Sequence, residues 1–126
     1  MRLNPDCVRD ILIEVEQSST YSTGLNLNTN IDNMLFKKYS WAEITYHITQ
    51  CVQAKLLTSA TIFETDGYAC ISDLTPTGHE FLANIRQDTN WNKTKEIAKK
   101  VGTLSLSAIK DIASNVISEV IQSYFK

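Results

Sequence analysis

The sequence predicts an α+β fold in which amphipathic helices surround one β-hairpin. Apolar residues recur at helical spacing along most of the chain, caps and prolines begin several helices, and Asp66-Gly67 signals a tight turn between two apolar runs. The chain has 126 residues, of which 43% are hydrophobic and 21% charged, as is usual for a globular domain. We expect a domain over residues 1–88 and a helical extension over residues 89–126.

The first half of the chain contains two helix starts. Asn4 and Pro5 predict a helix whose apolar face carries Val8, Ile11, Leu12 and Val15. The capping box Ser40-Trp41-Ala42-Glu43 predicts a second helix, from residue 40 to about residue 54, with a buried face formed by Trp41, Ile44, Ile48 and Cys51.

The segment between these helices is rich in Ser, Thr and Asn. We expect residues 17–33 to form a loop, held to the core by Leu25, Leu27 and Ile31. Residues 34–36 suit either a short strand or a helical turn.

The Asp66-Gly67 turn predicts antiparallel strands over residues 58–64 and 68–74. A two-residue turn there pairs Phe63 with Cys70 and Ile62 with Ile71, and it places Phe63 and Tyr68 on the same face. Three further helices follow. They begin at Thr75-Pro76, near residue 91, and at Ser105, and Gly102 ends the second of them.

Two motifs flank the hairpin, AKLL at residues 54–57 and LTPTGHEFL at residues 74–82. This order of helices, apolar step and hairpin resembles a winged-helix domain. The segments MRLNPDCVRDIL (1–12), YHI (46–48), GHEFLANIR (78–86) and WNKTK (91–95) resemble a family from phages and prophages of Gram-positive bacteria, catalogued as domain of unknown function 2513. The resemblance implies a mobile-element origin and a winged-helix-like fold. It brings no established activity, and the 17–33 loop departs from it.

Catalytic and metal motifs are not found in the sequence. The two histidines, His47 and His79, have no partners at metal-ligand spacing, and we interpret both as structural. Cys51 and Cys70 are expected to fill the core. Cys7 lies in a first helical turn, where a thiol pKa is lowered, and is the most reactive candidate of the three. No catalytic partner stands near it in sequence, so we interpret it as a buried or incidental thiol. We therefore expect a protein that is not an enzyme and needs no cofactor. An enzyme using Cys7 or His79 is the most distant alternative.

Binding is the function that we expect, either to DNA or to a protein partner. The leading hypothesis is a regulatory phage or prophage module, and the alternative is a phage effector that modulates a host defence or transcription protein. The outward positions of the second helix and the two lysines before it form the candidate contact surface, which consists of Lys37, Lys38, Thr45, Thr49, Gln50 and Gln53. The net charge of −2 and the acidic hairpin tip, Glu64-Thr65-Asp66-Gly67, argue against strong DNA binding.

The last helix has an apolar stripe wider than one-sided packing requires. It predicts a homodimer through Ile109, Ile112, Val116, Ile117, Val120, Ile121 and Tyr124. The alternative is that this helix folds back on the rest of the chain. The lysines at 93, 95, 99 and 100 form either a solvated face or an edge that binds phosphate or an acidic protein. Because the chain has no apolar run of membrane-spanning length and its start does not look like a signal peptide, we expect it in the cytoplasm of a bacterial host cell, without membrane contact.

Overall fold

The computed structural model describes residues 1–125, which form six helices and one three-stranded antiparallel sheet. This confirms the α+β class. The chain divides into two compact units, Met1–His79 and Glu80–Lys126. The first unit contains α1 (Pro5–Ser18), β1 (Leu25–Asn28), α2 (Met34–Lys38), α3 (Trp41–Gln53), β2 (Ala60–Phe63) and β3 (Tyr68–Ile71).

Helix α4 (Pro76–Ile85) begins in the first unit and continues into the second, which also contains α5 (Asp88–Val101) and α6 (Leu106–Ser123). The expected division into residues 1–88 and 89–126 stays a prediction. None of the helices that the structure describes combines the length and apolarity that a membrane span requires.

The helix caps form as the sequence predicts. The Asn4 side chain accepts a hydrogen bond from the Asp6 N–H, and at the start of α3 Ser40 and Glu43 exchange both bonds of the capping box. Ser105 caps α6, and Gly102 ends α5 in the left-handed conformation. Helix α5 begins three residues earlier than expected, because its first turn is polar and carries no apolar signal.

The segment expected to be a loop contains a strand that the prediction missed. Strand β1 pairs with β3, so that β3 is the central strand in the order β1-β3-β2. Leu25 and Leu27 are buried, as expected, but Ile31 is 65% exposed and does not hold the segment to the core. The run at 34–36, left undecided between strand and helix, belongs to α2.

The hairpin confirms the predicted faces but not the predicted register. Phe63 pairs with Tyr68 and Ile62 with Ala69, so that Glu64 to Gly67 form a four-residue loop. The Gly67 N–H donates to the Glu64 carbonyl across this loop, at 3.3 Å. The pairing is shifted by two residues from the prediction, and because side chains alternate with a period of two, Phe63 and Tyr68 still share one face.

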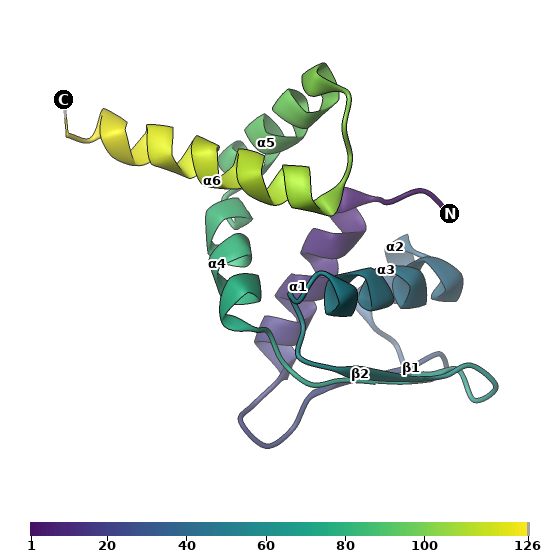
Figure 1. The fold of residues 1–126 in the computed structure, drawn as a ribbon. Helices are drawn as coiled ribbons and strands as arrows, with labels where there is room; N and C mark the ends of the chain where they lie inside the picture. The colour runs from purple at the N-terminus through teal and green to yellow at the C-terminus, as the bar shows by residue number, and fades with distance from the viewer. Residues whose placement is uncertain (126) are drawn as a thin grey trace. The chain divides into compact units, whose positions relative to one another are not determined.

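The helices of the first unit cover one face of its sheet. Figure 1 shows α1, α2 and α3 on the same side of the strands. Helices α1 and α3 pack on each other through their fully buried faces, and Leu25, Leu27, Ala69 and Ile71 cover them from the sheet. Within residues 1–79 no helix covers the opposite face, where the Phe63 and Tyr68 rings lie 5.7 Å apart.

In the second unit α5 packs against α6. Trp91 and Ala98 from α5 are buried, as are Ile109, Ala113 and Val116 from α6. Lys93 and Glu119 form an ion pair between the two helices at 3.7 Å.

The Gly67→Ala variant should lower the free energy of unfolding by about 1–3 kcal/mol, because Gly67 has a φ of 61° that other residues adopt only with strain. The new Cβ would also lie 2.5 Å from the Thr29 hydroxyl oxygen, so Thr29 would have to shift. Urea unfolding measures the loss in the wild-type chain and in a Thr29→Ala background. We expect a smaller loss in that background; an equal loss would mean that the contact with Thr29 contributes nothing.

Candidate functional site: the groove between α3 and β2

An open groove of about 380 Å³ lies between the exposed side of α3 and strand β2. Helix α3 supplies most of its wall, and the hairpin supplies the opposite edge. The lining residues are Trp41, Ala42, Thr45, Tyr46, Thr49, Gln50, Ile62 and Glu64. This volume lies within the range of ~300–1,000 Å³ that binding pockets usually have.

Trp41 is the best-anchored side chain of the groove. Its ring stacks on Phe36 with 6.3 Å between the ring centres, and its indole Nε1–H donates to the Glu64 carboxylate at 3.1 Å. The predicted buried face of α3 therefore needs a correction. Ile44, Ile48 and Cys51 are fully buried, whereas Trp41 remains half-buried and borders the groove.

The two threonines expected to reach outward use their hydroxyl protons within α3. Thr45 is only 7% exposed, which corrects its predicted outward position, and it donates to the Trp41 carbonyl at 2.9 Å. Thr49 is exposed but donates to the Thr45 carbonyl, also at 2.9 Å. A hydroxyl has only one proton, and each threonine donates its proton within α3. Both side chains can therefore only accept a hydrogen bond from a partner. Gln50 lines the groove, and Gln53 is exposed but does not line it.

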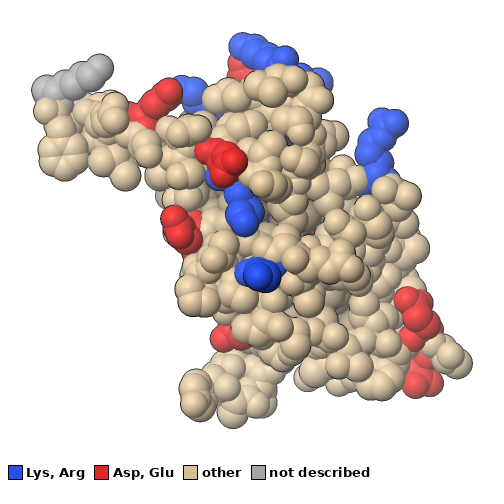
Figure 2. All heavy atoms as spheres, viewed as in Figure 1, with Lys and Arg blue, Asp and Glu red and all other residues tan. Residues whose placement is uncertain are grey.

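The two lysines of the candidate surface lie outside the groove lining. Lys37 pairs with Asp32 at 3.9 Å and Lys38 with Asp10 at 3.4 Å, so carboxylates offset both cations locally. The first unit has five Lys and Arg against nine Asp and Glu, a net charge of −4. Figure 2 shows acidic side chains at the end of the β2–β3 hairpin. Neither the groove nor the hairpin end therefore has the positive charge that a phosphate backbone attracts.

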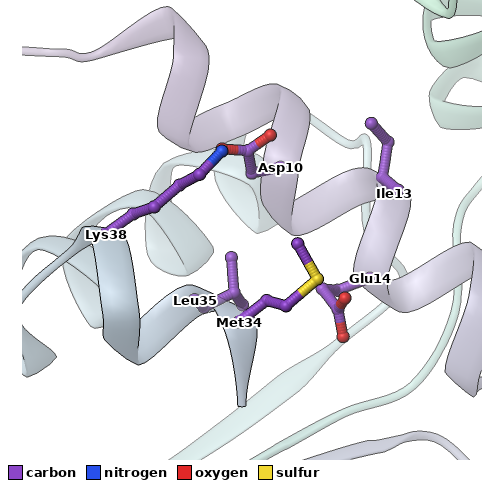
Figure 3. Close-up of a pocket in the computed structure, with 6 residues that line it drawn as sticks. All are labelled: Asp10, Ile13, Glu14, Met34, Leu35 and Lys38. Atoms are coloured by element: carbon purple, nitrogen blue, oxygen red, sulfur yellow. The ribbon is translucent and has the colours of Figure 1, made fainter.

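A second hollow lies between α1 and α2 and has a volume of about 50 Å³. Figure 3 shows that Lys38 reaches across it toward Asp10, with Met34 and Ile13 at its other side. The Tyr39 hydroxyl also donates to Asp10, at 2.7 Å. Burial, and to a smaller extent this bond, raises the pKa of Tyr39 above its ordinary value. The hollow is large enough for water but too small for an organic ligand.

Both ring nitrogens of His47 are bonded to backbone groups. The Asn4 N–H donates to Nε2 at 2.8 Å, and Nδ1 lies 2.7 Å from the Glu43 carbonyl, to which it donates in the neutral tautomer. This buried imidazole therefore links the start of α1 to the first turn of α3. His79 is exposed near the start of α4. Within residues 1–125, no three His, Cys, Asp or Glu side chains form a cluster able to hold a metal ion.

Cys7 is a buried thiol, which agrees with the favoured interpretation and not with the alternative of a reactive thiol. Its side chain is fully buried, and burial raises its pKa from the ordinary 9.0 to about 12, with smaller contributions from the charges of Glu43 and Asp10. Burial outweighs the helix N-terminus. Cys51 fills the core as predicted, but Cys70 lies half-exposed on the outer face of the sheet and is not a core residue.

The apolar stripe of α6 is divided between two environments. Ile109 and Val116 are 1% and 2% exposed in the single chain, so they are not available to a second chain as predicted. Ile112, Ile117 and Val120 are half-buried, and Ile121 and Tyr124 are 51% and 84% exposed. Only the C-terminal part of the stripe remains available for association.

Comparison with known proteins places the chain in a family without an assigned activity. The family model described as "Hypothetical protein (DUF2513)" matches residues 2–105, so the chain belongs to this family, as the sequence resemblance predicted. The matched residues include α1 to α5. An uncharacterized protein of Haemophilus influenzae (strain Rd KW20) is 33% identical over 129 residues, which cover 96% of this chain and 99% of that protein. No solved structure matches the chain significantly.

The thiols provide a direct test of these environments. At about pH 8, a maleimide should modify one cysteine in the folded protein and all three in concentrated urea, because the buried thiols are inaccessible and protonated. Mass spectrometry of the intact chain counts the adducts. The Cys70→Ser variant should show no adduct when folded, and rapid labelling of Cys7 in that variant would contradict the structure.

Proposed function

We propose that this chain is a winged-helix module that functions by binding a protein partner in the groove between α3 and β2. The element order α1-β1-α2-α3-β2-β3, with β3 central in the sheet, is the order of a winged helix and supports this fold. In this proposal α3 is the recognition helix and the β2–β3 hairpin is the wing.

We propose a protein partner rather than DNA because of the charge of the groove. None of the eight lining residues is basic, and the one charged residue, Glu64, is acidic. DNA-binding proteins neutralise phosphates with Lys and Arg, and an acidic groove repels the backbone that it would have to follow. Protein surfaces impose no such requirement, and half-buried aromatic side chains such as Trp41 and Tyr46 are typical anchors of protein interfaces.

Binding rather than catalysis also agrees with the use of the reactive side chains. The nitrogens of His47 are bonded to backbone groups, and the thiols of Cys7 and Cys51 are buried with raised pKa values. We propose that the module acts in the cytoplasm of a bacterial host, as a phage or prophage regulator or as an effector on a host protein. In either role the groove is the contact surface.

An arginine introduced into the groove distinguishes the two kinds of partner. A photo-crosslinking residue at Gln50, with Ser22 as the control site outside the groove, captures the partner in the bacterium that carries the gene. The Thr49→Arg variant should then weaken binding of the purified partner at least about tenfold, or ~1.4 kcal/mol, whereas Ser22→Arg should not. If instead the protein binds DNA, with affinity that falls steeply with salt and rises in Thr49→Arg, the partner is DNA.

We further propose that the exposed end of α6 pairs with the same surface of a second chain. Ile117, Ile121 and Tyr124 follow at i, i+4 and i+7, the spacing of a helix face that meets another helix. Among residues 112–125 only Glu119 is charged, so two copies of this face would meet with little charge repulsion. A two-fold axis would bury the same patch on both chains.

The Ile121→Glu variant tests this pairing. A buried carboxylate would separate the chains, because the site offers it no partner and each lost aliphatic contact costs ~1.5–3 kcal/mol. Sedimentation velocity should show a dimer for the unaltered chain and a monomer for the variant. The control Gln122→Glu adds the same charge about 100° around the helix and should remain dimeric. A monomeric unaltered protein would refute the pairing.

A further inference from the structure

We infer that the groove between α3 and β2 selects an arginine side chain of its partner, through the Trp41 indole and the Glu64 carboxylate. This inference rests on the proposed function, because it names the chemistry that the protein partner would present to the same groove. It does not follow from the winged-helix order, since it depends on two side chains that meet from different elements.

The first step is the fixed juxtaposition of an aromatic ring and a carboxylate. Trp41 stands at the start of α3 and Glu64 directly after β2, 23 positions apart in sequence, yet the indole Nε1–H donates to Glu64 Oε2 at 3.1 Å. Stacking on Phe36, with an interplanar angle of 24°, restrains the indole from the side of α2. Both groups are therefore positioned at the groove before any ligand arrives.

The second step is the chemistry of that pair. An indole face attracts a cation placed over it, and a carboxylate accepts hydrogen bonds most strongly from a charged donor. The indole N–H donates a hydrogen bond to Oε2 of Glu64, and no hydrogen bond to Oε1 is found among the described residues. A guanidinium is planar, so it stacks on an indole while its N–H groups point sideways to a carboxylate. A lysine ammonium lacks this flat face.

The third step is the charge of the surroundings. Asp66 adds a second carboxylate to the same hairpin loop, and the unit of residues 1–79 has a net charge of −4. An acidic field of this kind raises the local concentration of a basic partner segment. A neutral apolar segment would leave Glu64 without a charged partner. The groove therefore fits a basic protein segment better than an apolar one.

Two amino-acid probes test the inference with the full chain. N-acetylargininamide and N-acetylcitrullinamide have nearly the same shape, but only the first is charged. We expect the arginine probe to shift the NMR signals of the Trp41 indole N–H and of the backbone amides of Thr49 and Gln50, and to bind at least fivefold more tightly than the citrulline probe, a difference of ~1 kcal/mol. The indole signal of Trp91, which is 2% exposed, should not move.

Two charge-neutralising variants test the role of Glu64. Glu64→Gln keeps an oxygen that accepts the indole hydrogen bond but removes the charge, and it should lower the affinity for the arginine probe at least fivefold. Asp66→Asn removes the same charge from the same loop without touching the groove lining, and it should change the affinity less than twofold. Equal affinity for both probes, or equal losses in both variants, would overturn the inference.

The failure of this inference is distinct from the failure of the proposed function. If the probes do not move the groove signals while Thr49→Arg still weakens binding of the captured partner, the groove binds a protein without selecting arginine. If Thr49→Arg leaves the captured partner bound, the proposed function fails, whatever the probes show.

Discussion

The first unit depends on a backbone corner at Leu56, where the end of α3, the start of β2 and the start of α4 meet. The Leu56 N–H donates to the Cys51 carbonyl at 2.9 Å, which ends α3, and the Leu56 carbonyl accepts from the Thr75 N–H at 3.0 Å. Gly78 packs so closely on this carbonyl that any Cβ atom would collide with it. Lys55 enters the corner with a φ of 61°, and Leu56 is fully buried. One residue thus fixes the direction in which the hairpin leaves α3.

The corner determines the shape of the groove, because the groove lies between the two elements that the corner joins. Next to the corner, Leu57 and Leu74 form an isolated antiparallel β-bridge, and the Thr58 N–H donates to the Asp73 carbonyl at 2.9 Å. Beyond this point β2 runs alongside α3 far enough for Glu64 to reach Trp41. His47, in the middle of α3, accepts a hydrogen bond from the Asn4 N–H. Helix α3 is therefore restrained at its C-terminal end by the corner and at its middle by Asn4, while Thr49 and Gln50 remain at the groove.

The sequence predicts local features of this fold better than long-range ones. The caps at Asn4, Ser40 and Ser105 involve groups within three residues of one another, so the sequence alone identifies them. Strand β1 was missed because its four residues lie in a polar segment, although the alternation Leu25-Asn26-Leu27-Asn28 is a strand signal. The sequence also did not predict the hairpin register, because Asp66-Gly67 is typical of a two-residue turn but lies here in a four-residue loop. The sequence favours a buried Cys7, but the N-terminal segment alone does not reveal that burial raises the pKa of this thiol more than the helix N-terminus lowers it.

The candidate surface shows the same division between local and tertiary information. Helical spacing places Thr49 and Gln50 on the outward side of α3, and the structure leaves both at the groove. Spacing alone could not show that Thr45 is buried, that Lys37 and Lys38 pair with carboxylates, or that Glu64 meets Trp41. If α3 is a recognition helix, as we propose, its surface differs from one that follows a phosphate backbone, because the one charged residue that lines the groove, Glu64, is acidic. Charge acts at longer range than shape, and it therefore selects among partners before the fit of the groove is tested.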